Sequence, residues 1–467
     1  MSEKFDLIVI GAGPGGYVAA IRAAQLGFKV ALVEKGKTLG GTCLNVGCIP
    51  SKALLESSEH FHQAQNKFRT HGINISGLTI DLKQMLKRKE KVVSSITRGV
   101  EFLIKKNKIS LHTGNGKIIE PGIVEISNED NKNTITGERI LLATGSEAMP
   151  LPGATFNGDR IMSSTDALEL PDIPEHLLIV GGGVIGVELG SIYARLGSRI
   201  TIVEFLDGLI PGMDLELGNA LQRCLKKLKF KFHFNSKLNS ASQDGDSVKV
   251  EIIQKDGELL KLKVDRVLVC IGRRPFSENL GIAELGIKKN ERGQIEVDEN
   301  YQTSHPGIYA VGDIIAGPML AHKASEEGVV CVERMNGHMA SLNYDLIPSV
   351  VYTWPEVASV GKSEEDLQQE GRGFNKGSFP FKASGRARVS EEFDGFIKIL
   401  ADKETDEILG IHMLGPRCAD LISEAVVAME YRASAEDITC ISHAHPSFAE
   451  AFKEAALAAT GNRAIHI

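Results

Sequence analysis

The sequence predicts an α/β protein with two Rossmann-like domains and a C-terminal α+β domain. Three observations support this fold class. A strand, a glycine-rich turn and a helix follow one another twice, within residues 5–34 and within residues 176–204. The chain has 467 residues, which is too long for one ordinary hydrophobic core. From residue 346 onward no such turn recurs, and apolar segments typical of an antiparallel sheet precede two helix-like runs.

Each copy carries every part of a dinucleotide-binding fingerprint. The glycines are Gly11, Gly13 and Gly16 in the first copy and Gly181, Gly183 and Gly186 in the second. The first glycine makes the turn, the second lets the backbone approach a pyrophosphate, and the third lets helix and strand pack closely. Glu34 and Glu204 stand at the same distance from the first glycine, where they would accept hydrogen bonds from ribose hydroxyls. The repeated context favours two nucleotide sites over two ordinary strand–helix turns.

Two dinucleotide sites in one chain suggest that electrons pass between two carriers, FAD at one site and NAD or NADP at the other. Glu204 favours NAD, because its carboxylate would repel a 2′-phosphate. The next residues, Phe205 and Leu206, supply no arginine to hold that phosphate. Three further strands end at glycine turns, within residues 139–145, 266–272 and 306–313, although each alone would be an ordinary strand end.

The bulk properties argue against two classes of protein. The formal net charge is −7 and no basic stripe stands out, so no nucleic-acid partner is expected. The basic segment 83–91 alternates with apolar residues, which predicts a solvated helix face. No apolar stretch reaches about 18 residues, so no membrane span is expected. The chain begins without a signal or transit pattern, which predicts a cytoplasmic protein, although a mature organellar protein would look the same.

Cys43 and Cys48 carry the most specific chemical signal. They lie five positions apart in a glycine-rich segment, where two thiols can close a small, reducible disulfide ring. Pro50 is expected to open a helix, so Cys48 would lie at a helix N-terminus, whose dipole stabilises a thiolate. Zinc is the alternative, but no second Cys pair or Cys/His cluster is evident, so no metal is predicted. The other cysteines are expected to be small buried apolar side chains: Cys224, Cys270, Cys331, Cys418 and Cys440.

Two more residues are candidates for chemistry, each with a structural alternative. Lys52 follows Cys48 by four residues on the same helix face, so its charge could steady the thiolate or a flavin edge; a surface lysine is the alternative. His445 precedes Glu450 by five residues, across a helix expected to begin at Pro446. Such a pair makes an oriented general base near neutral pH, although a lone histidine is as often structural.

The motifs together resemble those of the flavin-dependent disulfide reductases, in the same order and along essentially the whole chain. The resemblance rests on segment 40–52, the glycine turn at 11–16, the turns at 143–145 and 312–313, and the terminal His-Pro-x-x-x-Glu at 445–450. It implies FAD and NAD as cofactors, and an enzyme that oxidises protein-bound dihydrolipoamide and passes hydride to NAD⁺. The implied partners are a second copy of the chain, in a homodimer, and the lipoyl domain of the acyltransferase component of 2-oxo acid dehydrogenase complexes. Service in the glycine cleavage system is implied as an alternative or an addition.

By the same resemblance, Cys43 forms the mixed disulfide with the substrate and Cys48 faces the flavin. His445, held by Glu450, is the acid–base group and reaches the disulfide of the partner subunit. The implied FAD-binding residues are Gly11, Gly13, Gly16, Glu34, Lys35, Thr42, Lys52, Gly116, Thr144, Gly145, Ser146, Asp313, Met319, Leu320, Ala321 and His322. The implied NAD-binding residues are Gly181, Gly183, Gly186, Glu188, Glu204 and Gly272, with Glu188 also paired to Lys52.

The same reasoning divides the chain into four parts. Residues 1–149 are expected to bind FAD and residues 150–275 to bind NAD. Residues 276–345 form a central domain that completes the FAD site, and residues 346–467 form a C-terminal interface (dimerisation) domain.

Overall fold

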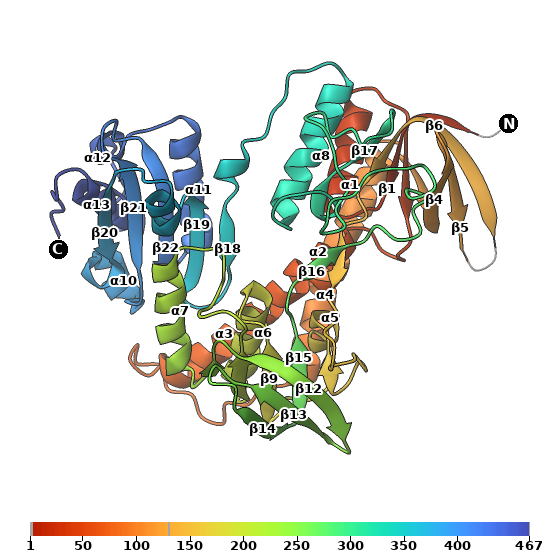
Figure 1. Ribbon diagram of the computed structural model, residues 1–467. Helices are drawn as coiled ribbons and strands as arrows, with labels where there is room; N and C mark the ends of the chain where they lie inside the picture. Colours follow the sequence, from red (N-terminus) through yellow and green to blue (C-terminus); the bar gives the residue numbers. More distant parts are fainter. Residues whose placement is uncertain (1–2, 129–130, 467) are drawn as a thin grey trace.

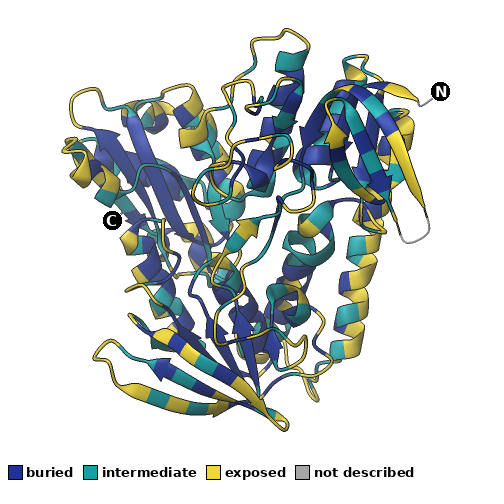
Figure 2. Ribbon diagram, turned by 45° about the vertical axis from the view of Figure 1, so that its right-hand side comes forward, coloured by how far each residue is buried: buried dark blue, intermediate teal, exposed yellow. Residues whose placement is uncertain are grey.

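The computed structural model describes residues 3–128 and 131–466, and the chain folds around three main sheets (Figure 1). One sheet belongs to the N-terminal part, one to the middle of the chain, and one to the C-terminal part. Figure 2 shows that the central strands of the three sheets are mostly buried, whereas edge strands of the first sheet and the outer faces of the surrounding helices are partly exposed. The α/β fold with two Rossmann-like regions and a C-terminal α+β domain is confirmed.

The first sheet has seven strands in the order β3-β2-β1-β6-β5-β4, with β17 paired to β6. The strands are β1 (Lys4–Ile10), β2 (Val30–Glu34), β3 (Ser110–Thr113), β4 (Asn115–Glu120), β5 (Ile123–Ser127), β6 (Lys132–Leu142) and β17 (Ile308–Ala310). β1 pairs in parallel with β2 and with β6. Helices α1 (Pro14–Gln25) and α8 (Ala321–Met335) pack against each other beside this sheet (Figure 1). The 306–313 strand therefore joins a sheet formed by residues far earlier in the chain.

The second sheet repeats this plan with five parallel strands in the order β11-β10-β9-β15-β8. The strands are β8 (Ile161–Met162), β9 (His176–Val180), β10 (Arg199–Val203), β11 (Lys231–His233) and β15 (Arg266–Val269). Its helices are α5 (Ser164–Ala167), α6 (Val184–Arg195) and α7 (Leu215–Lys227). An antiparallel sheet of β12 (Lys237–Asp244), β13 (Ser247–Ile253) and β14 (Leu259–Val264) extends from it. The paired strands β7 (Ser146–Ala148) and β16 (Arg273–Pro275) connect the two Rossmann-like regions.

The third sheet is antiparallel, in the order β18-β19-β22-β21-β20. Its strands are β18 (Ser349–Val351), β19 (Glu356–Gly361), β20 (Phe374–Pro380), β21 (Phe396–Asp402) and β22 (Ile408–Gly415). The surrounding helices are α9 (Glu364–Gln369), α10 (Gly385–Ser390), α11 (Cys418–Glu430), α12 (Ala435–Cys440) and α13 (Glu450–Ala459). Every residue of β22 is buried, because both α11 and α7 of the second region contact this strand (Figure 1). An antiparallel sheet covered in this way loses the usual alternation of apolar and polar residues.

The solvated face expected for residues 83–91 is present with one buried lysine, and of the cysteines expected to be buried, Cys224 and Cys270 are half-buried and Cys440 is exposed. The 83–91 segment lies on α4 (Leu82–Lys106), which is mostly solvated on one face, but Lys89 on it is buried. Its ammonium is satisfied there by the carbonyl of Leu168, at 3.0 Å, and by the carboxylate of Glu169. Cys440, at the end of α12, is exposed instead of buried. Within residues 3–128 and 131–466, no helix is long and apolar enough to cross a membrane.

Candidate active site

The three sheets surround one large cavity of about 2330 Å³, and most of the sequence-predicted site residues line it. Of the residues expected to bind FAD or NAD, those that line the cavity are Gly11, Gly13, Glu34, Lys35, Thr42, Lys52, Gly116, Thr144, Gly145, Ser146, Gly181, Gly183, Glu188, Glu204, Gly272, Asp313, Met319, Leu320, Ala321 and His322. Cys43 and Cys48 line it as well. Gly16 and Gly186 lie behind its wall, and His445 and Glu450 lie elsewhere.

The two glycine turns have the same geometry. Gly11 and Gly181 have φ angles of +102° and +112°, which a residue with a side chain adopts only with strain. A Cβ atom on Gly16 would lie 1.8 Å from the carbonyl of Gly11, so helix and strand pack closely there. A Cβ on Gly183 would meet no atom within 4 Å, which leaves backbone open beside the cavity. The three glycines therefore have the three different constraints that pyrophosphate binding at a helix N-terminus requires.

The fingerprint carboxylates, Glu34 and Glu204, also accept hydrogen bonds from the backbone of their own turns. Glu34 accepts hydrogen bonds from the N–H groups of Ala12, at 2.8 Å, and Gly36, at 2.7 Å. Glu204 accepts the equivalent bonds from Gly182, at 2.5 Å, and Leu206, at 2.8 Å. Each carboxylate has lone pairs left for another donor and lies on the cavity wall.

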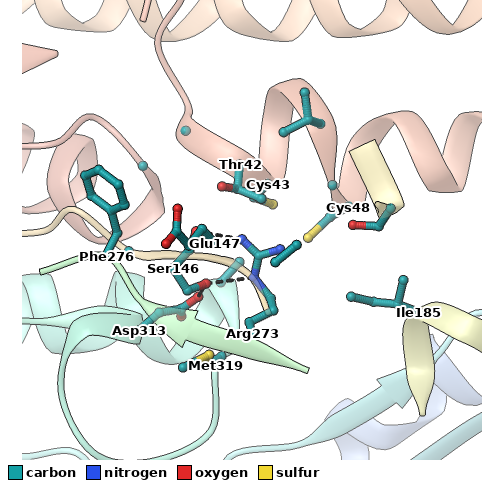
Figure 3. Close-up of a pocket in the computed structure, with 18 of the residues that line it drawn as sticks. Thr42, Cys43, Cys48, Ser146, Glu147, Ile185, Arg273, Phe276, Asp313 and Met319 are labelled. Carbon is teal, nitrogen blue, oxygen red and sulfur yellow. Dashed lines mark hydrogen bonds between the residues drawn. The ribbon is translucent and has the colours of Figure 1, made fainter. Parts of the chain in front are cut away.

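Cys43 and Cys48 lie on two successive helices that meet at Gly47. Cys43 belongs to α2 (Gly41–Val46), and Cys48 is the first residue of α3 (Cys48–Asn66), two residues before the helix start expected at Pro50. Both are free thiols here, and the Cys43 thiol donates a hydrogen bond to Cys48. Figure 3 shows both on one side of the pocket, with Arg273 and Asp313 on the other.

The two thiols differ in acidity. The hydrogen bond from Cys43, together with the Lys52 charge, lowers the pKa of Cys48 to about 7 against the opposing effect of burial. The same hydrogen bond and burial raise the pKa of Cys43 well above its usual value. Cys43 therefore keeps its proton at neutral pH, and Cys48 is the thiol of the pair that ionises more readily. Among the described residues, no group of three or more His, Cys, Asp or Glu side chains could hold a metal ion.

Lys52 forms the expected ion pair with Glu188, at 2.8 Å. Glu188 is buried on α6 and also accepts the backbone N–H of Tyr352, at 2.9 Å. Two helical turns further along both helices, Arg195 of α6 pairs with Glu59 of α3, at 3.0 Å. Two ion pairs with the same spacing fix the cysteine-bearing helix parallel to the helix of the second fingerprint. Sequence reasoning found the first pair and missed the second, which no motif marks.

Asp313 is held in place by a relay of hydrogen bonds that Figure 3 shows as dashed lines. Ser146 donates to Asp313 at 2.5 Å, and Arg273 donates to both the hydroxyl and the carbonyl of Ser146 at 2.7 Å. Behind Asp313, the buried side chains of Lys323 and Glu327 form an ion pair, at 3.0 Å. Glu327 accepts the N–H of Gly312 and Lys323 donates to its carbonyl, so the pair fixes the turn that carries Asp313. Sequence reasoning missed Arg273, although its position directly after Gly272 was a usable signal.

His445 and Glu450 form the expected pair, with 2.7 Å between Nδ1 and Oε1. Burial opposes ionisation of Glu450, but the N–H of Ser447 and the imidazole of His445 hold its pKa below the usual range. The helix that was expected to begin at Pro446 begins at Glu450, so the pair bridges a loop and a helix N-terminus. The His445 side chain is 78% exposed and lies outside the cavity of its own chain.

The fold, the paired thiols and the two nucleotide turns define a class of flavin- and nicotinamide-dependent dithiol enzymes, and sequence comparison agrees. The chain belongs to the pyridine nucleotide-disulphide oxidoreductase family, whose model matches residues 5–328, and it is an oxidoreductase. The model of the family's dimerisation domain matches residues 347–456.

Within the family, the chain is similar to dihydrolipoyl dehydrogenases. It is 49% identical to mitochondrial dihydrolipoyl dehydrogenase 2 of Arabidopsis thaliana, over 100% of this chain and 92% of that protein. It is also 49% identical to the mitochondrial dihydrolipoyl dehydrogenase of Homo sapiens, over 99% and 92%. Among solved structures, LpdA of Mycobacterium tuberculosis matches with a TM-score of 0.89 at 25% identity, over 96% of this chain and 98% of that one. The flavoprotein disulfide reductase RclA of Escherichia coli matches with a TM-score of 0.87 at 26% identity, over 97% and 99%.

Proposed function

We propose that the protein is a dihydrolipoyl dehydrogenase, which oxidises protein-bound dihydrolipoamide through a Cys43–Cys48 disulfide and passes the electrons to NAD⁺. The observation that carries the proposal is the thiol pair at the N-terminus of α3, inside a cavity lined by two nucleotide-binding turns. A nucleotide-binding protein without redox chemistry needs neither a thiol with a pKa of about 7 nor an oriented His–Glu pair.

The residues of the cavity fit both cofactors. The N-terminal turn, with Glu34, Asp313 and the start of α8, is the proposed FAD site, and the turn with Glu204 and Gly272 is the proposed NAD site. Both turns leave backbone open where a pyrophosphate would lie, beside a helix N-terminus. When bound, FAD supplies the redox chemistry that links the dithiol to NAD⁺.

The chain's own residues account for the thiol exchange. His445 takes a proton from dihydrolipoamide, and the resulting thiolate attacks the Sγ of Cys43, which breaks the disulfide and releases Cys48 as a thiolate. The second substrate thiol then attacks the substrate sulfur of this mixed disulfide and gives its proton to the departing Cys43 sulfur. Lipoamide leaves with its own S–S bond, and the first proton stays on His445. Two electrons then reside on the cysteine pair, in the protonation state that their pKa values favour.

His445 is proposed to serve the cavity of a second copy of the chain, which makes the working enzyme a homodimer. The His445 side chain is exposed, and it lies in the domain that matches the family's dimerisation domain. The proposed partner is the lipoyl domain of the acyltransferase component of 2-oxo acid dehydrogenase complexes. A cytoplasmic location remains a proposal, since the curated relatives cited above are named mitochondrial.

The experiment that tests the function compares two substrate pairs. The purified holoenzyme should oxidise dihydrolipoamide with NAD⁺ and should show no turnover of glutathione disulfide with NADPH. The physical reason is that the proposed NAD site carries Glu204 and lacks a basic residue next to it. Initial rates at 340 nm measure both reactions, and a faster reaction with glutathione disulfide would assign the protein to a different disulfide reductase.

The nucleotide preference can be tested separately. We expect kcat/KM for NAD⁺ to exceed that for NADP⁺ by at least about a hundredfold, because a 2′-phosphate beside Glu204 is repelled by several kcal/mol. Phe205 is exposed on the cavity wall next to Glu204, so Phe205→Arg should narrow the ratio by about tenfold. Phe205→Leu is the matched control and should leave the ratio of kcat/KM for NAD⁺ to kcat/KM for NADP⁺ unchanged. Equal efficiency with both nucleotides in the unmodified enzyme would contradict the assignment.

A further inference from the structure

A buried cluster of charges joins the second Rossmann-like region to the C-terminal sheet. Lys398 lies on β21 and Asp214 caps the N-terminus of α7, and the side chains of both are fully buried. Their Nζ and Oδ1 atoms are 2.6 Å apart. Lys398 also reaches Glu216, at 3.1 Å, and Glu364, at 3.2 Å. Burial would lower the pKa of Lys398, but its hydrogen bonds to Asp214 and Glu216 raise it, so the ammonium stays charged.

Asp214 is held almost entirely by the C-terminal domain. Its Oδ1 accepts the N–H of Glu216 at the start of α7, at 3.0 Å, besides the Lys398 ammonium. Its Oδ2 accepts the N–H of Glu364, at 3.1 Å, and lies 4.0 Å from Nε2 of His412 on β22. Three elements of one domain thus fix a single carboxylate of the other, as α7 and the third sheet lie side by side in Figure 1.

Asp214 terminates the segment 205–213, which forms one wall of the nucleotide cavity. The wall residues of this segment are Phe205, Leu206, Pro211, Gly212 and Met213. The segment begins directly after Glu204. Within it, the N–H of Ile210 donates a hydrogen bond to the carbonyl of Gly182 in the second fingerprint, at 2.9 Å.

Leu209 and Ile210 of this segment pack into the core of the second Rossmann-like region, whereas its last residues lie beside an open space. A second, smaller cavity of about 350 Å³ lies next to Gly212 and Met213, between them and the C-terminal domain. The position of the segment at this end therefore depends on its anchor at Asp214.

We propose that Lys398 is a positioning residue for the nicotinamide nucleotide: through Asp214 it fixes the 205–213 segment against the second glycine turn. The C-terminal domain thereby sets the affinity for NAD⁺, although none of its charged residues in this cluster lines the cavity. The inference rests on the proposed NAD site and deepens it by naming a remote determinant of nucleotide binding.

The test uses Lys398→Met, which removes the charge and keeps most of the side-chain volume, in the holoenzyme. The Kd for NAD⁺ from titration calorimetry, and the KM for NAD⁺, should both rise by about tenfold, since removing one partner leaves Asp214 buried and unpaired. The KM for dihydrolipoamide and kcat should change by less than about twofold. Lys376→Met is the matched control: this lysine is 41% exposed, contacts Glu216 and Glu364 but not Asp214, and should leave both constants unchanged.

Two more variants keep the test decisive. Lys398→Arg should retain nucleotide affinity within about threefold, because a cation stays beside Asp214. If Lys398→Met does not fold, Asp214→Asn, which still caps α7, must raise the Kd for NAD⁺ in its place. The inference is overturned if the variant that folds binds NAD⁺ with an unchanged Kd, or if it loses kcat and affinity for both substrates to the same extent. In either case, turnover of dihydrolipoamide by the wild-type enzyme would still support the proposed function. Failure of the wild type to bind NAD⁺ would overturn both.

Discussion

Replacing Cys48 by serine should reduce dihydrolipoamide oxidation by at least about a thousandfold, because no disulfide can form and the substrate thiolate has no S–S bond to attack. Serine preserves the start of α3, so folding should be unaffected. Reduction of the bound flavin by NADH should persist, since that half-reaction needs no dithiol. Stopped-flow absorbance at the flavin band and steady-state turnover measure the two half-reactions independently.

The matched control for this change is Cys440→Ser. Cys440 is an exposed free thiol outside the cavity, and its loss should leave both half-reactions at wild-type rates. Substantial dihydrolipoamide turnover in Cys48→Ser would remove the cysteine pair from the mechanism. Loss of flavin reduction together with turnover would instead indicate damage to the cofactor site.

A mixed dimer should regain activity from two nearly inactive parents. Cys43→Ser and His445→Ala are each expected to lose about 10² to 10⁴ in rate or more, because one removes the attacked sulfur and the other the general base. In a dimer of one Cys43→Ser and one His445→Ala subunit, a base that works across the interface leaves one site whole. Activity near half of the wild-type value per dimer is then expected.

Co-expression with two different affinity tags isolates the mixed dimer, so that slow subunit exchange plays no part. Each parent, carrying both tags and purified in the same way, sets the background rate. Lys453, on the same helix as Glu450, donates to the carbonyl of Ile441 and offers a control variant, Lys453→Met, which should keep wild-type activity because it removes neither the attacked sulfur nor the general base. A mixed dimer no faster than its parents would show that His445 acts within its own chain or not at all.

Local sequence determined the elements better than it determined the environment of single side chains. The strand expected at residues 176–180 is β9 without a change in bounds, because its apolar residues are all buried in a parallel sheet. The helix expected after the first glycine turn is α1, which begins inside the turn at Pro14, since Gly15 and Gly16 are already helical. Lys89 and Cys440 were misjudged because a residue's neighbours in sequence do not say which distant segment covers it.

The site was predictable where one short motif carries it and unpredictable where it depends on contacts between domains. The cysteine pair, the two glycine turns and the His445–Glu450 pair each lie within a few residues of sequence. Arg273 meets Ser146 across 127 positions, and Lys398 meets Asp214 across 184. Even where a motif points to one residue, as Gly272 points to Arg273, no periodicity or spacing identifies its partner, so only the folded chain reveals the pair.

The long helices α1, α3, α6 and α8 all begin at the cavity wall. Each contributes the partial positive charge of its free N–H groups, in a protein whose formal net charge is −7. At low ionic strength the net charge of the molecule therefore repels an anionic dinucleotide at long range, whereas these helix N-termini attract its pyrophosphate inside the cavity. Capture is short-ranged, and because the attracting dipoles are fixed in buried backbone, dissolved salt screens the distant repulsion far more than the local attraction. We therefore expect added salt to weaken the long-range repulsion of the cofactor more than its binding inside the cavity.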